Sequence, residues 1–176
     1  MMDEHLVISA LGSDKPGIIS ELSRFALEQQ CNILDTRMTV LGEAFALLMM
    51  VSGDNDAITQ LKQTLSEAAN NLGLTITLQN TQQKQQQDPA LPYHVDVVAI
   101  DNPGIVHEIT GFFSDRKINI EEMNTGTYSA AHTGTSMFSL TVEVKIPGSI
   151  NISNLKDEFI SFCDERNLDA TIEPCK

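Results

Sequence analysis

Hydrophobic and polar positions along this chain follow first a strand pattern and then a helix pattern, and the same succession occurs twice. Apolar runs at Leu6–Leu11 and His94–Ile100 predict strands. Behind each run, apolar residues recur at helical spacing and predict a helix with one buried face. The two apolar faces consist of Ile18, Ile19, Leu22, Phe25 and Ala26, and of Ile105, Val106, Ile109, Phe112 and Phe113.

Two strands, a second helix and a short last strand are predicted next in each half. The strands are expected at Ile33–Leu41 and Phe45–Ser52, and at 119–129 and 136–144. The second helices take their apolar faces from Ile58, Leu61, Leu65, Ala68 and Leu72, and from Leu155, Phe159 and Phe162. Last strands are expected at Leu74–Leu78 and Asp169–Ile172. The order βαββαβ, present twice, predicts an α+β fold of two tandem ferredoxin-like units, with antiparallel sheets and helices on one face.

A direct comparison of the two halves supports a duplication. Residues 14–35 align without a gap to residues 101–122, with 8 identities in 22 positions. The identical residues of the first copy are Asp14, Pro16, Gly17, Ile18, Glu21, Phe25, Asn32 and Ile33. Between the halves, residues 81–92 are rich in glutamine, end in two prolines and lack apolar periodicity. We therefore expect one domain at 1–80, a linker at 81–92 and a second domain at 93–176.

Composition and charge narrow the classes of function. The formal net charge is −13, and neither half carries a basic stripe, so we expect no direct binding to nucleic acid. The three cysteines are widely spaced and odd in number, which favours free thiols in a reducing compartment. The N-terminal residues lack a signal-peptide pattern and no apolar run approaches a membrane span, so we expect a cytoplasmic protein without membrane contact. No metal-ligand spacing and no acid–base or nucleophile constellation is apparent, so we expect no metal, no cofactor and no enzymatic activity.

The repeated Pro-Gly turn is the main candidate for a binding site. Proline suits the first position of a helix, and glycine leaves the adjacent backbone bare. The following N–H groups and the helix dipole favour a carboxylate, while a nearby aspartate could hold an ammonium group. A small zwitterion would find both partners in one loop, formed in the two copies by Asp14, Pro16, Gly17 and Ile18, and by Asp101, Pro103, Gly104 and Ile105. The alternative is that the aspartates only cap the helices, or that the loops serve only domain packing.

Asn32 and Asn119 stand at the corner between the first helix and the second strand of each half. One interpretation is structural, because asparagine tolerates the left-handed conformation that ends many helices. The other is functional: a side-chain amide that completes the pocket beside the Pro-Gly loop. The sequence alone leaves both open.

This arrangement resembles the ACT domain, a βαββαβ ligand-sensing module. The likeness rests on "DKPGII" with "CNILD" and on "DNPGIV" with "INIEE", and two such units span nearly the whole chain. In that family small ligands, often amino acids, bind where two domains pair. The resemblance implies contacts from the loop before the Pro-Gly and from the asparagine of the second strand, which here are Asp14, Asn32, Asp101 and Asn119.

Two ACT units without a catalytic domain, together with the opening "LVISALGSDKPGIISEL", resemble the family of glycine cleavage system transcriptional repressors. That resemblance implies a regulator that does not bind DNA itself. Its partners would be a small amino acid, glycine in particular, and a DNA-binding transcriptional activator, and we expect a homodimer. The alternative is an amino-acid-sensing accessory subunit of a metabolic enzyme.

Overall fold

The computed structural model of the chain describes residues 4–82 and 90–175. The chain divides into two compact units, one on each side of residues 83–89. Most of the predicted linker, 81–92, lies outside the described residues, although strands occupy Thr81 at one of its ends and Leu91 and Pro92 at the other. The predicted domain bounds, 1–80 and 93–176, therefore stay a prediction.

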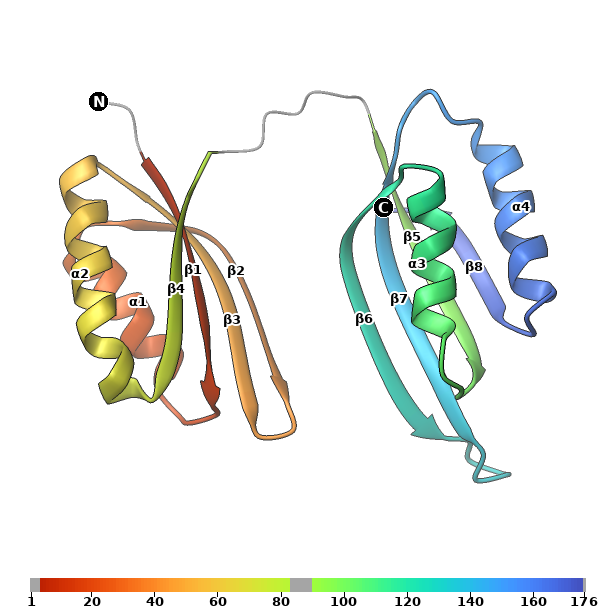
Figure 1. Cartoon of the computed structure of the whole chain (residues 1–176), viewed down its shortest axis with the longest axis horizontal. Helices are drawn as coiled ribbons and strands as arrows, with labels where there is room; N and C mark the ends of the chain where they lie inside the picture. Colours follow the sequence, from red (N-terminus) through yellow and green to blue (C-terminus); the bar gives the residue numbers. More distant parts are fainter. Residues whose placement is uncertain (1–3, 83–89, 176) are drawn as a thin grey trace. The chain divides into compact units, whose positions relative to one another are not determined.

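Each unit is a four-stranded antiparallel sheet with two helices on one of its faces (Figure 1). The first unit contains β1 (Glu4–Ser13), α1 (Ile18–Glu28), β2 (Asn32–Leu41), β3 (Ala44–Gly53), α2 (Asn55–Leu72) and β4 (Leu74–Thr81). The second contains β5 (Leu91–Ile100), α3 (Ile105–Asp115), β6 (Asn119–Ser129), β7 (Ser136–Ile146), α4 (Ile152–Asp164) and β8 (Asp169–Pro174). The strand orders are β2-β3-β1-β4 and β6-β7-β5-β8, which confirms the predicted fold class.

The predicted elements are all present, but several begin or end elsewhere. Both first strands are longer than their apolar runs, because β1 starts at Glu4 and β5 at Leu91. Backbone pairing with β3 continues through Glu4 and His5, and pairing with β7 continues through Leu91 and Pro92, so pairing and not the apolar run sets the length of each strand. The helices α1 and α3 begin at Ile18 and Ile105, so the prediction that proline takes the first helical position was wrong.

The core of each unit lies between the sheet and its two helices. In the first unit, alternate residues of β1 and β3 face α1 and α2 and are almost fully buried, and they are Leu6, Ile8, Ala10, Phe45, Leu47, Met49 and Val51. In the second unit four phenylalanines, Phe112, Phe113, Phe159 and Phe162, pack edge to face or tilted, with ring centroids 5.1–5.4 Å apart. Contacts between helices and sheet therefore stabilise each unit on one side only.

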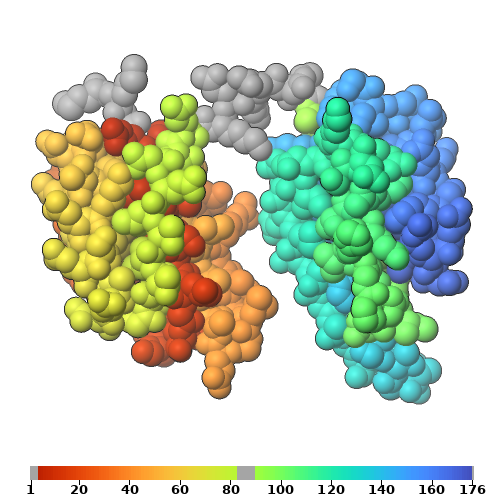
Figure 2. All heavy atoms as spheres, in the orientation of Figure 1, coloured from red at the N-terminus to blue at the C-terminus, as the bar shows by residue number. Residues whose placement is uncertain are grey.

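The other side of each sheet, which we call its open face, carries no helix (Figure 1). In the space-filling view, β2 and β3, in orange, form part of the surface of the first unit (Figure 2). The second strand of each unit is also an edge strand, and all ten residues of β2 are exposed. The edge strands β2 and β6 contain a β-bulge at the same relative position, between Ile33 and Asp35 in β2 and between Ile120 and Glu122 in β6.

Candidate functional site

The Pro-Gly loops lead into α1 and α3 with the same backbone geometry. Gly17 and Gly104 are the N-cap residues, with φ of 94° and 110° in the left-handed region. A Cβ added at either glycine would meet no atom within 4 Å, so sterics do not demand glycine there. The positive φ does, because side chains are disfavoured in that conformation.

Neither loop caps its helix with a side chain, and this distinguishes α1 and α3 from the other two helices. At the start of α2, Asp54 Oδ1 accepts a hydrogen bond from the Ala57 N–H at 2.8 Å. At the start of α4, Asn151 Oδ1 accepts one from the Asn154 N–H at 3.1 Å. The starts of α1 and α3 have no such bond, so their first N–H groups remain available to an external acceptor.

The two aspartates of the loops are exposed and do not act as helix caps. The Asp14 N–H donates to the Glu43 carbonyl, and the Asp101 N–H donates to the Ser136 carbonyl, each at 3.0 Å. These bonds fix each loop to the start of β3 or β7. The Asp101 carboxylate also accepts a long hydrogen bond of 3.5 Å from the Ser136 hydroxyl. Both carboxylates therefore lie in loops with a defined backbone and remain accessible to solvent.

Of the predicted site residues, Ile18 and Ile105 contribute differently from the others. Their side chains are buried, with exposed fractions of 5% and 3%, and belong to the hydrophobic cores. They can offer only backbone N–H groups to a ligand. Pro16 and Pro103 stand just outside the helices, where their fixed φ shapes the turn.

Asn32 and Asn119 lie at the far end of their units from the loops. Ser52 is the register partner of both Asn32 and His5, whereas the loop follows Ser13 at the opposite end of β1. The intervening helix has 11 residues, which places the two ends about 16 Å apart. No single unit brings its loop and its asparagine together, and the joint site stays a prediction that requires a second domain.

The asparagines also do not take the left-handed conformation suggested by their position. They are the first residues of β2 and β6, and Gln30 and Lys117, each with φ of 56°, make the turn after the helix. Asn119 donates from Nδ2 to Glu121 Oε1 at 2.9 Å. The structural interpretation of these asparagines as helix-ending residues was therefore wrong.

Two grooves in the second unit were not predicted from the sequence. One, of about 740 Å³, lies between α3 and α4, and the other, of about 610 Å³, lies between α3 and the start of β6. His107 and Gly111 line both grooves, and Asn119 lines the second. Neither groove includes the Pro-Gly loop, and no pattern in the sequence marks them, because they arise from the spacing between packed elements.

Two arginines connect the helices across the first groove in a reciprocal way. Arg116 donates to Glu158 at 2.9 Å, and its guanidinium lies 3.7 Å from the centre of the Phe112 ring. Arg166, at the end of α4, pairs with Glu108 at 3.5 Å and stacks on Phe162 at 3.8 Å. Because both guanidinium groups are already paired, the groove presents no free anion-binding arginine.

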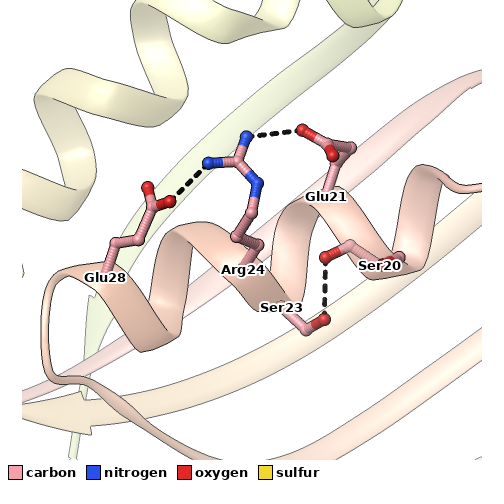
Figure 3. A network of polar contacts seen from close by, with 5 residues as sticks. All are labelled: Ser20, Glu21, Ser23, Arg24 and Glu28. Atoms are coloured by element: carbon pink, nitrogen blue, oxygen red, sulfur yellow. Dashed lines mark hydrogen bonds and ion pairs between the residues drawn. The ribbon is translucent and has the colours of Figure 1, made fainter.

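In the first unit the comparable arginine network stays within one helix (Figure 3). Arg24 pairs with Glu21 at 2.6 Å and with Glu28 one turn later, on the outer surface of α1. The hydrogen bond from Arg24 lowers the pKa of Glu21, and the two carboxylates raise the pKa of Arg24. All three groups are exposed, so solvent screens these pairs and they do not form a binding site.

The sequence of the chain is similar to that of named proteins over almost its whole length. The model of the ACT domain matches residues 4–79. The glycine cleavage system transcriptional repressor of Escherichia coli is 30% identical over 168 residues, covering 96% of this chain and 88% of that protein. The chain belongs to the family of the glycine cleavage system transcriptional repressors. The full-length relatives named in this repressor family are regulators, and the chain is accordingly a regulatory ACT protein and not an enzyme.

Solved structures agree with membership in the repressor family. A crystal structure that carries the provisional name of glycine cleavage system transcriptional repressor superposes with a TM-score of 0.76 at 27% identity, covering 100% of this chain and 99% of that one. A protein of Galdieria sulphuraria gives a TM-score of 0.81 at 23% identity, which supports the fold alone. A UPF0237 protein of Methanocaldococcus jannaschii is 32% identical over 77 residues, which are 86% of that protein but only 43% of this chain.

Two further observations concern membranes and metals. No helix in the described part of the chain is both long and apolar enough to cross a bilayer. Within residues 4–82 and 90–175, no three histidine, cysteine, aspartate or glutamate side chains gather in a group that could hold a metal ion. Of the three cysteines, Cys31 and Cys163 are buried and Cys175 is partly buried, each as a free thiol.

Proposed function

We propose that the chain represses transcription of the glycine cleavage system by contacting a DNA-binding activator, and that a small amino acid, glycine in particular, controls this contact. The observation that carries the ligand part is the pair of uncapped helix starts. The duplicated Pro-Gly loops leave the first N–H groups of α1 and α3 open, although α2 and α4 in the same fold are capped.

The ligand would bind with its carboxylate on the N–H groups that follow Gly17 or Gly104. Its ammonium group would pair with Asp14 or Asp101, which are exposed in the same loops. Asn32 or Asn119 lies too far away within its own unit, so the amide contact would come from a second copy of the chain, and we propose a homodimer. This arrangement agrees with the binding of ligands between paired domains that the ACT resemblance implies.

The size of glycine sets an upper limit to its affinity. With five heavy atoms and a ceiling of about −1.5 kcal/mol per atom, the best attainable free energy is about −7.5 kcal/mol, or a Kd of a few micromolar. Loss of one charge-assisted hydrogen bond, worth about 1.5–3 kcal/mol, should weaken binding by roughly ten- to a hundredfold. Titration calorimetry on Asp14→Ala and Asp101→Ala measures this loss for each copy.

A matched control is Asp54→Ala, which removes the side-chain cap of α2 without touching either loop. We expect it to lower stability by about 1 kcal/mol and to leave glycine affinity unchanged. Absence of amino-acid binding at millimolar concentration contradicts the ligand proposal, and so does wild-type affinity in both loop variants.

The activator contact follows from the charge and from the repressor family. A chain with net charge −13 gains little from counterion release on DNA, so its own binding to an operator should be undetectable at moderate salt. A gel-shift assay should show an effect of the protein only when the activator is present. A pull-down separates this function from its alternative, since the main prey would be either a DNA-binding activator or a metabolic enzyme.

A further inference from the structure

The open face of the first sheet is apolar at its centre. The strand register places side chains of β1 and β3 on this side of the sheet, away from α1 and α2. Leu11 and Leu48 are 54% and 51% exposed, although both are large hydrophobic residues. They belong to a group, the apolar face, which consists of Val7, Leu11, Ala46, Leu48 and Met50.

The second unit shows that the fold does not require such a face. Strand pairing relates the two sheets position by position, since Ser9 lies opposite Leu48 in one and Asp96 lies opposite Thr141 in the other. Where the first unit has Val7 and Met50, the second unit has the register pair His94 and Glu143. The same fold is thus formed with polar residues at the centre of the open face, where His94 pairs with Asp96 at 3.2 Å and Thr141 donates to Asp96 at 2.9 Å, although Ile100 and Tyr128 are exposed toward one end of the same face.

The two open faces differ even more clearly in their charged residues. On the open face of the first sheet, the described strands carry one acid and one base, Asp35 and Arg37, which pair with each other at 3.7 Å. On the open face of the second sheet, one lysine stands among five acids, and the charged residues are Asp96, Glu122, Glu143, Lys145, Asp169 and Glu173. Two copies of a chain with net charge −13 repel each other, and they meet with the least repulsion where the surface is neutral.

The whole open face of the first sheet, of which the apolar face is the centre, is large enough for a small specific interface. Four strands at a spacing of about 4.8 Å, with about eight residues of roughly 3.4 Å each, cover about 500 Å² on each copy. Two copies would bury about 1,000 Å², which is near the lower limit for a specific interface.

We propose that the open face of the first sheet is a self-association surface, on which a second copy of the chain places the same face. The contact is isologous, with Leu11 and Leu48 of each copy packed between the two sheets. This contact supplies the surface of the homodimer that is part of the proposed function. The inference rests on the proposed function only in assuming that homodimer. It can be measured without any amino acid, activator or DNA, so its failure leaves the ligand and activator proposals untouched.

Sedimentation velocity on the full chain, from about 1 to about 200 µM, is the test, because this range detects the weak association that is typical of interfaces near the lower size limit. We expect wild type to shift from monomer to dimer over this range. Leu11→Lys should raise the dimer Kd by about a hundredfold, since each dimer would bury two unpaired ammonium groups. This substitution also makes the chain less negative, so general charge repulsion cannot account for the loss.

The matched control is Val98→Lys, which adds the same charge at the equivalent position of the second sheet, where Val98 lies opposite Ser139 as Leu11 lies opposite Ala46. It should leave the dimer Kd unchanged. Leu48→Thr is a milder variant that installs the residue found at the equivalent position of β7, and we expect it to raise the Kd about tenfold.

Circular dichroism confirms that each variant is folded, and Leu48→Thr keeps the test decisive if Leu11→Lys does not fold. If the wild-type protein stays monomeric over the whole concentration range, the self-association proposal is wrong. Equal weakening by Leu11→Lys and Val98→Lys also overturns it, as does a dimer that Leu48→Thr leaves unchanged.

Discussion

Exchange of glycine for alanine at two positions of the second unit should have opposite effects on stability, although neither position is crowded. Gly104 is the N-cap of α3, and Gly111 lies in the middle of the same helix. A Cβ would meet no atom within 4 Å at either residue, so steric clashes do not contribute. The difference comes only from the backbone, because Gly104 has a φ of 110° and Gly111 is helical.

The magnitudes follow from the two conformations. At Gly104, the left-handed conformation costs an alanine about 1–2 kcal/mol, and the reduced entropy of the unfolded chain offsets about 0.4–1 kcal/mol of this. We expect Gly104→Ala to lower the free energy of unfolding by about 1 kcal/mol. Gly111→Ala should raise it by about 1 kcal/mol, because alanine is that much better than glycine within a helix.

The chain provides its own probe for this measurement. It has no tryptophan, and its two tyrosines, Tyr93 and Tyr128, both lie in the second unit. Tyrosine fluorescence therefore reports the unfolding of this unit alone. The Tyr93 side chain is buried, with an exposed fraction of 8%, so its surroundings change on unfolding. With a urea m-value of about 1 kcal/mol per M, the two midpoints should differ by about 2 M.

Shifts of equal sign in the two variants would refute this backbone explanation. Gly42→Ala provides an independent check in the first unit, because it combines a positive φ of 62° with open surroundings. It should destabilise that unit as Gly104→Ala destabilises the second, and circular dichroism can follow it.

Two other predictions concern the core of the second unit. Phe159→Ala should lower the free energy of unfolding by about 3–5 kcal/mol in a urea titration, because the ring is fully buried against Phe112 and Phe113. Phe162→Ala should cost clearly less, because Phe162 is only partly buried, and equal losses in the two variants would contradict this explanation. Burial raises the pKa of Cys163 from 9.0 to about 11, so the unfolded chain loses this proton first and stability should fall as the pH rises from 9 to 11. Urea midpoints across this range should show a smaller decline for Cys163→Ala, and an unchanged decline would contradict the assignment.

The periodic part of the fold could be predicted from the sequence, because each helix and each central strand has an apolar face. Ile58, Leu61 and Leu65 recur at helical spacing and are fully buried in α2. The ends of elements were less predictable. Nothing in the pattern shows that β5 pairs through Leu91 and Pro92, because that depends on the length of β7.

The candidate loops were found from the sequence because the duplication retained Asp, Pro and Gly in both copies. The functional interpretation of the sequence placed Asn32 in a pocket beside the Asp14 loop, whereas within one unit the helix α1 holds the two apart. The apolar face was also missed, because Leu11 and Leu48 lie in nearly continuous apolar runs, in which the sequence does not show which residues face the core. Only the position of both helices on the other side of the sheet shows that these side chains are exposed.

The β-bulges of the edge strands β2 and β6 have a consequence for the behaviour of this protein at high concentration. A straight edge strand that is exposed along its whole length, as β2 is exposed, would offer its backbone groups to any extended chain and could start amyloid-like aggregation. The bulges, between Ile33 and Asp35 in β2 and between Ile120 and Glu122 in β6, shift the register near the start of these strands and bend each strand away from a flat template. A duplicated sheet exposes twice as many edges as a single domain, so a retained irregularity in each copy protects the chain against its own repeats.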